Sequence, residues 1–382
     1  MLTADAVIIG GGIVGTSIAY NLVKDGFKNV TLIEKEEILG AGSTSKSAGG
    51  VRHQYSNEIN IRMTIESLKI LRNFEEEMET KIDFRRHGYM FLASIQETLS
   101  TFKKNVELQN SLGVKVELLS PEEIKDIVPQ LNVEDIIGGT FCKLDGYLDP
   151  SGLVYGYSKH FKRLGGKIFT STEAKGIEIK NGKVFSVVTD RGEIRTETVV
   201  NAGGPYGGRI GEMAGIKIPV NPLKRQIFVT SPFNHIRPDA PMVIDFDDPF
   251  YFRPECGAIL MSMADKEEVH GFDTTLDWST LERVVEKAVH RIPVLGDARV
   301  MNGWAGLREL TPDQNAILGE VPGVKGFICA VGFSGHGVMH SPITGKLIAE
   351  LIIDGKSKTL PISEMSIERF SGGKTALEKG VI

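Results

Sequence analysis

Apolar and polar positions follow two different periods along this chain of 382 residues. Near the beginning, the apolar runs 6–9 and 30–33 flank a segment with helical spacing, which predicts strand, helix and strand in turn. A similar order returns in the run 326–331, which precedes a helix expected over residues 342–352. Continuous apolar runs are typical of strands buried on both faces of a parallel sheet. The two ends of the chain therefore predict an α/β fold.

The middle of the chain is richer in short strand-like runs. Residues 174–179 and 184–189 are such runs, and Asn181-Gly182 between them is a strong hairpin turn. Several more strand-like runs follow after residue 220: 225–230, 250–253 and 258–263. We therefore expect an antiparallel sheet that is inserted into the first fold.

The first apolar run leads directly into a glycine-rich turn, residues 10–15, with the spacing G-x-G-x-x-G. In a dinucleotide site, Gly10 permits the tight turn, Gly12 lets the backbone approach a pyrophosphate, and Gly15 lets helix and strand pack closely. The second apolar run ends in Glu34, whose carboxylate can accept hydrogen bonds from ribose hydroxyls. Strand, glycines, helix, strand and terminal acid in this order predict a dinucleotide-binding site.

Composition narrows the class of protein. The net charge of −5 gives no reason to expect nucleic acid or an anionic membrane surface as a partner. The three cysteines form no C-x-x-C pair, so neither a disulfide framework nor a metal site is expected. No apolar stretch approaches a membrane span, and the first residues lack a signal-peptide pattern. We expect a cytoplasmic enzyme, and abundant Lys, Glu and Ile favour a thermophilic source.

Other segments also combine a strand with glycines. Residues 198–205 end in small residues that let the chain pass close to a nucleotide, although a sharp crossover without a ligand would use the same glycines. Residues 303–319 lead to the strand 326–331, which runs into the turn 332–337 and a helix. Consecutive backbone N–H groups at such a helix start suit an anionic or electron-rich ring atom.

In these motifs and their order, the chain resembles the D-amino-acid oxidase superfamily of FAD enzymes. The resemblance spans nearly the whole chain and rests on these segments: Gly10–Gly15 with Glu34, Gly42–Ser45, Val199–Gly204, Gly303–Gly319 and Gly332–Gly337. Within the superfamily, the chain is similar to glycine and sarcosine oxidases, above all to the β subunits of heteromeric sarcosine oxidase and dye-linked L-proline dehydrogenase. The resemblance implies a catalytic subunit that oxidises the C–N bond of a small amino or imino acid by hydride transfer to flavin N5, with other subunits as partners.

The fold implied by the resemblance is a Rossmann-like FAD-binding domain with an inserted antiparallel-sheet substrate domain. The FAD-binding domain would comprise residues 1–80, 146–220 and 300–382, and the substrate domain residues 81–145 and 221–299. Residues implied to contact FAD lie in the glycine-rich segments and beside them: Gly10, Gly12, Ile13, Val14, Gly15, Glu34, Lys35, Gly42, Ser43, Thr44, Ala48, Gly49, Ala174, Ala202, Gly203, Gly204, Gly306, Arg308, Gly332, Gly335, His336 and Gly337.

The resemblance also implies roles at the substrate. A substrate carboxylate requires paired donors, which a guanidinium supplies, and Arg308 and Arg52 occupy positions where relatives bind that carboxylate. His336 would shape the flavin face, and Tyr251 would donate its hydroxyl to a carboxylate or cap the pocket, although a core aromatic is equally compatible. His53, next to Arg52 in the sequence, would support Arg52 without contacting the substrate. Trp304 is expected to serve packing.

Departures from the family pattern narrow the mechanism. Residues 304–310 contain no cysteine where monomeric sarcosine oxidase attaches its flavin, so we expect non-covalent FAD. Met339 replaces a lysine that binds substrate in those enzymes, and residues 257–264 lack the lysine that assists reaction with oxygen. A positive charge near N5 stabilises developing superoxide. Its absence favours a dehydrogenase that passes electrons to an acceptor that the sequence does not identify.

Two other functions remain open at the level of sequence. One keeps the fold and oxidises a 2-hydroxy acid or glycerol phosphate, which would require a base for the hydroxyl or a cluster of cations for the phosphate. The other is a flavin-bearing subunit whose complex carries its catalytic site elsewhere.

Overall fold

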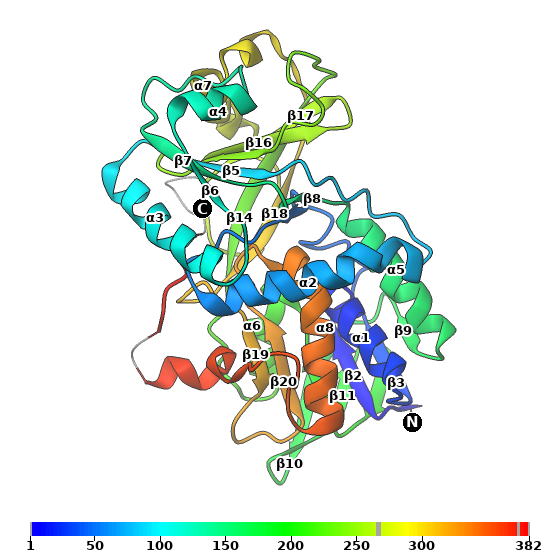
Figure 1. Cartoon of the computed structure of the whole chain (residues 1–382). Coiled ribbons are helices and arrows are strands. Elements are labelled where there is room, and N and C mark those ends of the chain that lie inside the picture. Colours follow the sequence, from blue (N-terminus) through cyan, green and yellow to red (C-terminus); the bar gives the residue numbers. More distant parts are fainter. Residues whose placement is uncertain (1, 265–268, 373–374, 381–382) are drawn as a thin grey trace.

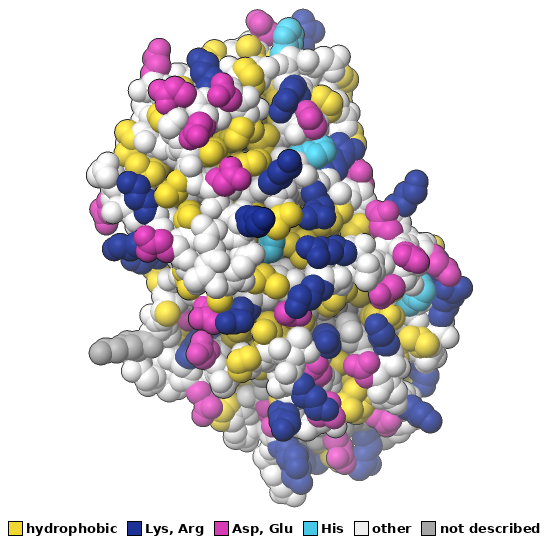
Figure 2. All heavy atoms as spheres, in the orientation of Figure 1, with side chains coloured by type: hydrophobic (Ala, Val, Ile, Leu, Met, Phe, Trp, Pro, Cys, Tyr) yellow, Lys and Arg dark blue, Asp and Glu magenta, His cyan; other side chains and the backbone are white. Residues whose placement is uncertain are grey.

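A computed structural model describes residues 2–264, 269–372 and 375–380 of the chain. Two large sheets occupy opposite ends of the molecule in Figure 1, and α2 (Glu58–Glu77) crosses between them. In Figure 2, lysine and arginine side chains gather near the middle of this face, where the two ends of the molecule meet. Among the described residues, no helix is both long and apolar enough to cross a membrane.

The first sheet has six strands and a buried core on both faces. Its order is β19 (Ile317–Glu320), β20 (Phe327–Val331), β13 (Val199–Asn201), β2 (Ala6–Ile9), β3 (Val30–Ile33) and β9 (Lys167–Phe169). All neighbouring strands are parallel except β19, which runs antiparallel to β20. This sheet confirms the α/β fold and the strand, helix and strand that the N-terminal pattern predicts.

Helices cover this sheet, and α1 (Ile13–Lys24) packs against α5 (Pro150–Arg163) and α8 (Gly337–Asp354). The expected start of the last helix at Pro342 is wrong, because α8 already begins at Gly337. Proline lacks the N–H that would bond to the carbonyl of Val338. The hydroxyl of Ser341 donates to that carbonyl instead, at 2.9 Å, so the helix continues through the proline.

A small four-stranded sheet lies beside the first one. Its order is β1 (Leu2–Thr3), β12 (Gly192–Arg195), β11 (Lys183–Thr189) and β10 (Ala174–Lys180). The predicted hairpin joins β10 and β11, and Asn181 and Gly182 have φ values of 52° and 72°. Left-handed backbone at both central residues is the turn geometry that asparagine and glycine favour.

The third sheet has eight strands and forms the opposite end of the molecule. Its order is β18 (Val300–Leu310), β14 (Asn221–Thr230), β17 (Ala258–Met263), β16 (Phe250–Glu255), β15 (Met242–Asp245), β5 (Tyr89–Ala93), β7 (Gly138–Cys142) and β6 (Glu117–Leu119). The sheet is mixed rather than wholly antiparallel, because β15 pairs with β5 in parallel. β18 pairs with β14 over residues 221–230, so the proposed boundary at residue 300 coincides with the start of a strand of this sheet.

The remaining elements connect or cover the sheets. The strands β4 (Gly50–Val51) and β8 (Gly146–Tyr147) form a short antiparallel pair. The helices α3 (Gln96–Ser111), α4 (Pro121–Ile127) and α7 (Leu281–Arg291) pack on the eight-stranded sheet, and α6 (Gly207–Met213) contacts β10 and β13. Ser120 is the N-cap of α4, and it forms a reciprocal capping box with Glu123.

Candidate active site

A cavity of about 530 Å³ lies where the six-stranded and eight-stranded sheets meet. At one end, it is lined by residues that directly follow the carboxyl ends of parallel strands: Gly10 after β2, Glu34 after β3 and Ala202 after β13. Ligands of parallel α/β sheets bind at this edge. The other end is lined by side chains of the eight-stranded sheet, including Tyr89, Tyr251 and Arg308.

The glycines of the first turn bring three pieces of backbone into contact. Gly10 has a φ of 114°, and a Cβ there would lie 2.4 Å from the carbonyl oxygen of Ala202. A Cβ at Gly15 would lie 1.9 Å from the carbonyl oxygen of Gly10, which explains why helix α1 can pack so close to β2. The turn thus leaves the first amides of α1 beside the cavity, where the helix dipole favours an anion.

Glu34 lies between this turn and the following loop. Its Oε2 accepts a hydrogen bond from Gly11 N at 2.7 Å, and its Oε1 accepts one from Glu36 N at 2.9 Å. The carboxylate is therefore held at the cavity wall, with lone pairs left for further donors. Nearby, the Lys35 ammonium lies 4.0 Å from the centre of the Tyr206 ring. Burial lowers the pKa of Lys35, but the Glu36 and Tyr206 side chains outweigh it and raise the pKa overall.

Arg52 is the cation at the opposite end of the cavity, and its side chain is 5% exposed. Its Nη1 donates to the carbonyl oxygen of Gln54, and its Nη2 donates to the carbonyl oxygen of Gly380 at 2.5 Å. The guanidinium also lies 4.1 Å from the centre of the Tyr55 ring. Within residues 2–264, 269–372 and 375–380, Arg52 makes no ion pair. A buried charge held by neutral acceptors favours an anion beside it.

Arg308 reaches the same cavity from β18. Its Nη2 donates to the carbonyl oxygen of Ser334 at 3.3 Å, and the backbone of Gly335 passes so close that a Cβ there would lie 2.3 Å from Nη2. Burial, and then the positive charges of Arg225 and Arg52, lower the pKa of Arg308 to about 10. Arg308 therefore remains charged at neutral pH, and the two candidate arginines share one cavity.

His336 begins the turn into α8 and lines the cavity with 3% of its surface exposed. Its ring contacts Tyr55 at 4.8 Å and His340 at 5.8 Å between ring centres. Burial and the charge of Arg52 hold the pKa of His336 well below 6.5, so the ring is neutral near pH 7. Its Nε2 has no hydrogen-bond partner in the described part of the chain. A neutral ring with a free nitrogen can accept or donate one hydrogen bond, depending on its tautomer.

Nearly all of the residues expected at the cofactor line this cavity, together with Arg52, His336 and Tyr251. The exceptions are Gly15, Ala174 and Gly332. Gly15 has the packing role that was expected of it. Ala174 instead packs among the apolar residues around β10, and Gly332 N donates to Glu309 Oε2 at 2.8 Å.

The cavity also contains residues that the sequence patterns did not single out: Lys46, Tyr89, Phe91, Arg225 and Glu309. Lys46 directly follows the stretch Gly42–Ser45, and Glu309 follows Arg308 directly. Tyr89 and Phe91 are two apart on β5, so they share one face of the sheet. That spacing on a predicted strand could have indicated from the sequence that both rings point to the same side of the sheet. Trp304 packs at the rim, where its Nε1 donates to the carbonyl oxygen of Lys46 at 3.1 Å.

Three buried side chains behind Arg52 combine ligand types that also occur at metals: His53, Cys142 and Asp145. His53 Nδ1 lies 2.6 Å from Asp145 Oδ1. Both carboxylate oxygens of Asp145 also accept a hydrogen bond from the backbone amide of His53, each at 3.1 Å. Two ligand atoms of one tetrahedral zinc ion would lie about 3.3 Å apart. The 2.6 Å between His53 Nδ1 and Asp145 Oδ1 is shorter and is a hydrogen-bond distance. Burial raises the pKa of the Cys142 thiol, which also opposes metal binding. The geometry is that of a hydrogen-bonded histidine and aspartate pair that supports the segment after Arg52.

Glu309 is a half-buried acid in the cavity wall. Burial raises its pKa to about 7, although the backbone N–H groups of Gly332 and Phe333 act in the opposite direction. His340, behind the cavity, shows the complementary effect, because burial lowers its pKa to about 3. The two groups therefore affect the pH dependence of stability with opposite signs.

We expect the stability of Glu309→Gln relative to the wild type to increase as the pH rises. Because its pKa is above the ordinary 4.5, Glu309 binds its proton more tightly in the folded chain, and the wild type loses stability between pH 4.5 and about 7. The variant lacks this titration, while His340 contributes equally to both proteins. Denaturant unfolding across this pH range, with the exposed Glu212→Gln as control, measures the difference. A difference that stays constant with pH would contradict a raised pKa.

Residues 5–351 match the family of FAD dependent oxidoreductases known as DAO. The chain therefore belongs to this family, and it is an FAD-dependent oxidoreductase. The cavity fits the cofactor: glycine backbone lines it where a side chain would collide, Gly12, Ile13 and Val14 at the start of α1 line it, and Glu34 stands at the end of β3.

Particular relatives can be named. L-proline dehydrogenase from P. horikoshii is 36% identical, with a TM-score of 0.91, over 98% of this chain and 99% of that chain. FAD-dependent oxidoreductase domain-containing protein 1 of Xenopus laevis is 31% identical, over 99% of this chain and 85% of its own. Mitochondrial sarcosine dehydrogenase of Mus musculus is 29% identical over 93% of this chain, which spans 40% of that relative.

Proposed function

We propose that this chain oxidises the C–N bond of a small amino or imino acid of the proline, sarcosine or glycine type. The observation that carries the proposal is Arg52, a buried guanidinium that lines the cavity and makes no ion pair with the described residues. A carboxylate beside it would form a charge-assisted pair with a guanidinium that is 5% exposed. Similarity to proline and sarcosine dehydrogenases supports an amino-acid substrate.

FAD, when bound, supplies the acceptor for a hydride from the carbon beside the amine. The residues of the chain then have to bind and orient the substrate. Arg52 and Arg308 would hold the carboxylate, while the Tyr251 hydroxyl, at the same end of the cavity, would donate to it or cap the pocket. His336 is neutral near pH 7, so it would shape the face of the site and accept or donate a hydrogen bond without carrying a charge.

We further propose a dehydrogenase with non-covalent FAD. None of the described cavity residues is a cysteine, which supports the absence of a thioether link. β17, which contributes Met263 to the cavity, contains no lysine, so the charge expected of an oxygen-activating site is missing from this strand. Lys46 also lines the cavity and is the residue to test if oxygen proves to be the acceptor. A role as the catalytic β-type subunit of a larger complex, and a thermophilic source, stay predictions.

A second candidate rests on His336. His336 lines the cavity, and its buried Nε2 has no hydrogen-bond partner among the described residues, so a neutral ring can accept a hydrogen bond from the hydroxyl of a 2-hydroxy acid. Both candidates use Arg52 for the carboxylate. They differ in whether the reacting carbon carries nitrogen or oxygen.

The test is the visible spectrum of the purified flavoprotein, followed without oxygen while L-proline, sarcosine, glycine and then L-lactate are added. Bleaching by an amino acid would support C–N oxidation, and bleaching by lactate alone would favour the second candidate. Turnover of the isolated chain with an artificial dye would eliminate a purely structural flavin subunit. If no compound reduced the flavin, the proposed reaction of this isolated chain would be wrong.

A further inference from the structure

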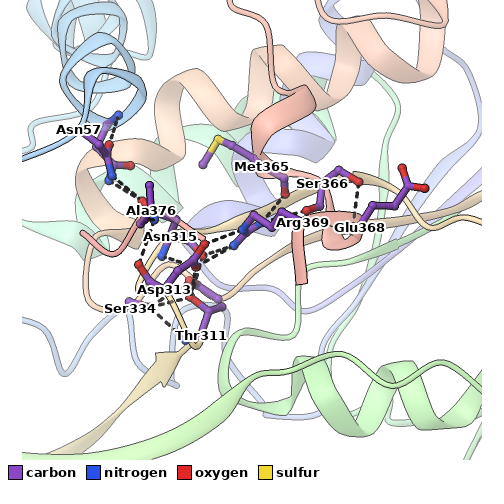
Figure 3. Close-up of polar contacts among 12 residues, drawn as sticks. Asn57, Thr311, Asp313, Asn315, Ser334, Met365, Ser366, Glu368, Arg369 and Ala376 are labelled. Atoms are coloured by element: carbon purple, nitrogen blue, oxygen red, sulfur yellow. Dashed lines mark hydrogen bonds and ion pairs between the residues drawn. The ribbon is translucent and has the colours of Figure 1, made fainter. Parts of the chain in front are cut away.

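The segment of residues 375–380, here called the C-terminal strap, lies against the active site. It is held at both ends of its described length. Asn315 Nδ2 donates to the carbonyl oxygen of Ala376 at 2.9 Å, and its Oδ1 accepts from Asn57 Nδ2 at 2.9 Å (Figure 3). At the other end, Gly380 lines the cavity and accepts the hydrogen bond from Arg52. The strap therefore joins the substrate end of the cavity to the start of α2.

Glu378 is the buried anchor of this strap, with 1% of its surface exposed. Its Oε1 accepts from Ser56 N at 2.8 Å, from Ser56 Oγ at 2.6 Å and from Gly380 N at 2.8 Å. Its Oε2 accepts from Asn57 N at 3.3 Å and from Asn60 Nδ2 at 3.1 Å. All of these donors except Gly380 N lie at the N-terminus of α2, where the helix dipole stabilises a negative charge. A carboxylate with this many donors is fixed in position.

The same carboxylate controls where the carbonyl of Gly380 points. Glu378 Oε1 holds Gly380 N, and the oxygen of that residue accepts from Arg52 Nη2 at 2.5 Å. On its other side, Arg52 is held by the carbonyl oxygen of Gln54. Two carbonyls thus fix the guanidinium, and one of them belongs to the strap. Without the strap, Arg52 would lose one of its two hydrogen-bond partners and would be free to turn.

The strap also separates two cavities. A second cavity of about 230 Å³ lies beside α3, and Gly380 and Phe91 line both cavities. Moving Gly380 would connect the two spaces and admit water to Arg52. Hydration weakens a charge-assisted pair between Arg52 and a carboxylate, because it raises the local dielectric constant.

We propose that Glu378 is a positioning residue for the substrate carboxylate: it anchors the strap so that Gly380 holds Arg52 in its binding orientation. This inference rests on the proposed role of Arg52. It assigns substrate affinity to a residue that does not itself line the cavity. It predicts that Glu378 and Arg52 act as one unit.

The test compares Glu378→Ala and Glu378→Gln with Glu364→Gln, an exposed glutamate in the same part of the chain, in the full FAD-loaded protein. We expect Glu378→Ala to raise KM for the carboxylate substrate about tenfold while kcat changes less than about twofold. Glu378→Gln keeps one acceptor oxygen and should fall in between. Flavin content and thermal unfolding establish that each variant is folded, and Glu378→Gln serves if the alanine variant is not. An unchanged KM in a folded variant would overturn the proposal.

A double-mutant cycle separates positioning from a general structural effect. In the Arg52→Ala background, Glu378→Ala should raise KM no further, because its effect passes through Arg52. Effects that multiply in the double variant would overturn the proposal. A second readout is the change in flavin absorption when acetate is added, since it requires no turnover. If amino acids fail to reduce the flavin but Arg52→Ala and Glu378→Ala both lose acetate binding, the proposed C–N oxidation is wrong and the positioning role of Glu378 stands. No response to acetate in the wild type would overturn the positioning role, while the proposed reaction would still be decided by flavin reduction with amino acids.

Discussion

Arg52→Ala is expected to raise KM for the amino-acid substrate about 100-fold, while the protein keeps its FAD. The guanidinium is buried at the substrate end of the cavity and makes no ion pair with the described residues, so its loss removes a charge that a carboxylate would use. Arg52 lies at the end of the cavity opposite the glycine-rich turn, so cofactor affinity should change little. Steady-state kinetics with an artificial electron acceptor and the flavin content of the purified variant measure the two effects.

Arg62→Ala is the matched control, because Arg62 is an exposed arginine on α2 that pairs with Glu58. Arg308→Ala provides the competing assignment within the same cavity. If Arg52→Ala left KM unchanged and Arg308→Ala raised it, the carboxylate would belong to Arg308 alone. An unchanged KM in both variants would show that the substrate carboxylate does not bind at this end of the cavity.

Gly10→Ala is expected to yield protein with little or no FAD. The new Cβ would lie 2.4 Å from the carbonyl oxygen of Ala202, and the φ of 114° is one that side-chain-bearing residues rarely adopt. To relieve this contact, the turn and the end of β13 must separate, which displaces the amides that face the cavity. The ratio of flavin to protein absorption and the dissociation constant for added FAD check the expectation.

Gly26→Ala is the control for backbone strain, because Gly26 has a φ of 91° but no atom within 4 Å of its added Cβ. It should keep its FAD. If Gly10→Ala proves unfolded, Gly12→Ala replaces it, since its Cβ would meet Thr44 Oγ1 at 3.3 Å, a contact that a small shift relieves. Normal FAD affinity in folded Gly10→Ala and Gly12→Ala would contradict the assignment of this turn to the cofactor.

The elements that the sequence predicted well depend on neighbouring residues. The hairpin at Asn181-Gly182 follows from the backbone conformations that these two residues favour. The start of α8 was misplaced because Pro342 resembled a helix start, and its effect is offset by Ser341 and by the packing of α8 against α1 and α2. The parallel pairing of β5 and β15 was also missed, since it joins segments about 150 residues apart and leaves no local signal.

The sequence by itself determined the nucleotide end of the cavity, because apolar runs, glycines and a terminal acid act through the local conformation of adjacent residues. It also identified Arg52 and Arg308 as candidates, through resemblance to positions where relatives bind a substrate carboxylate. Only the tertiary structure decided that both arginines share one cavity and that the strap holds Arg52. The partners of Arg52 are backbone carbonyls, at Gln54 and Gly380, and every residue carries the same carbonyl. Which carbonyl meets the guanidinium is therefore set by the fold rather than by any pattern in the sequence.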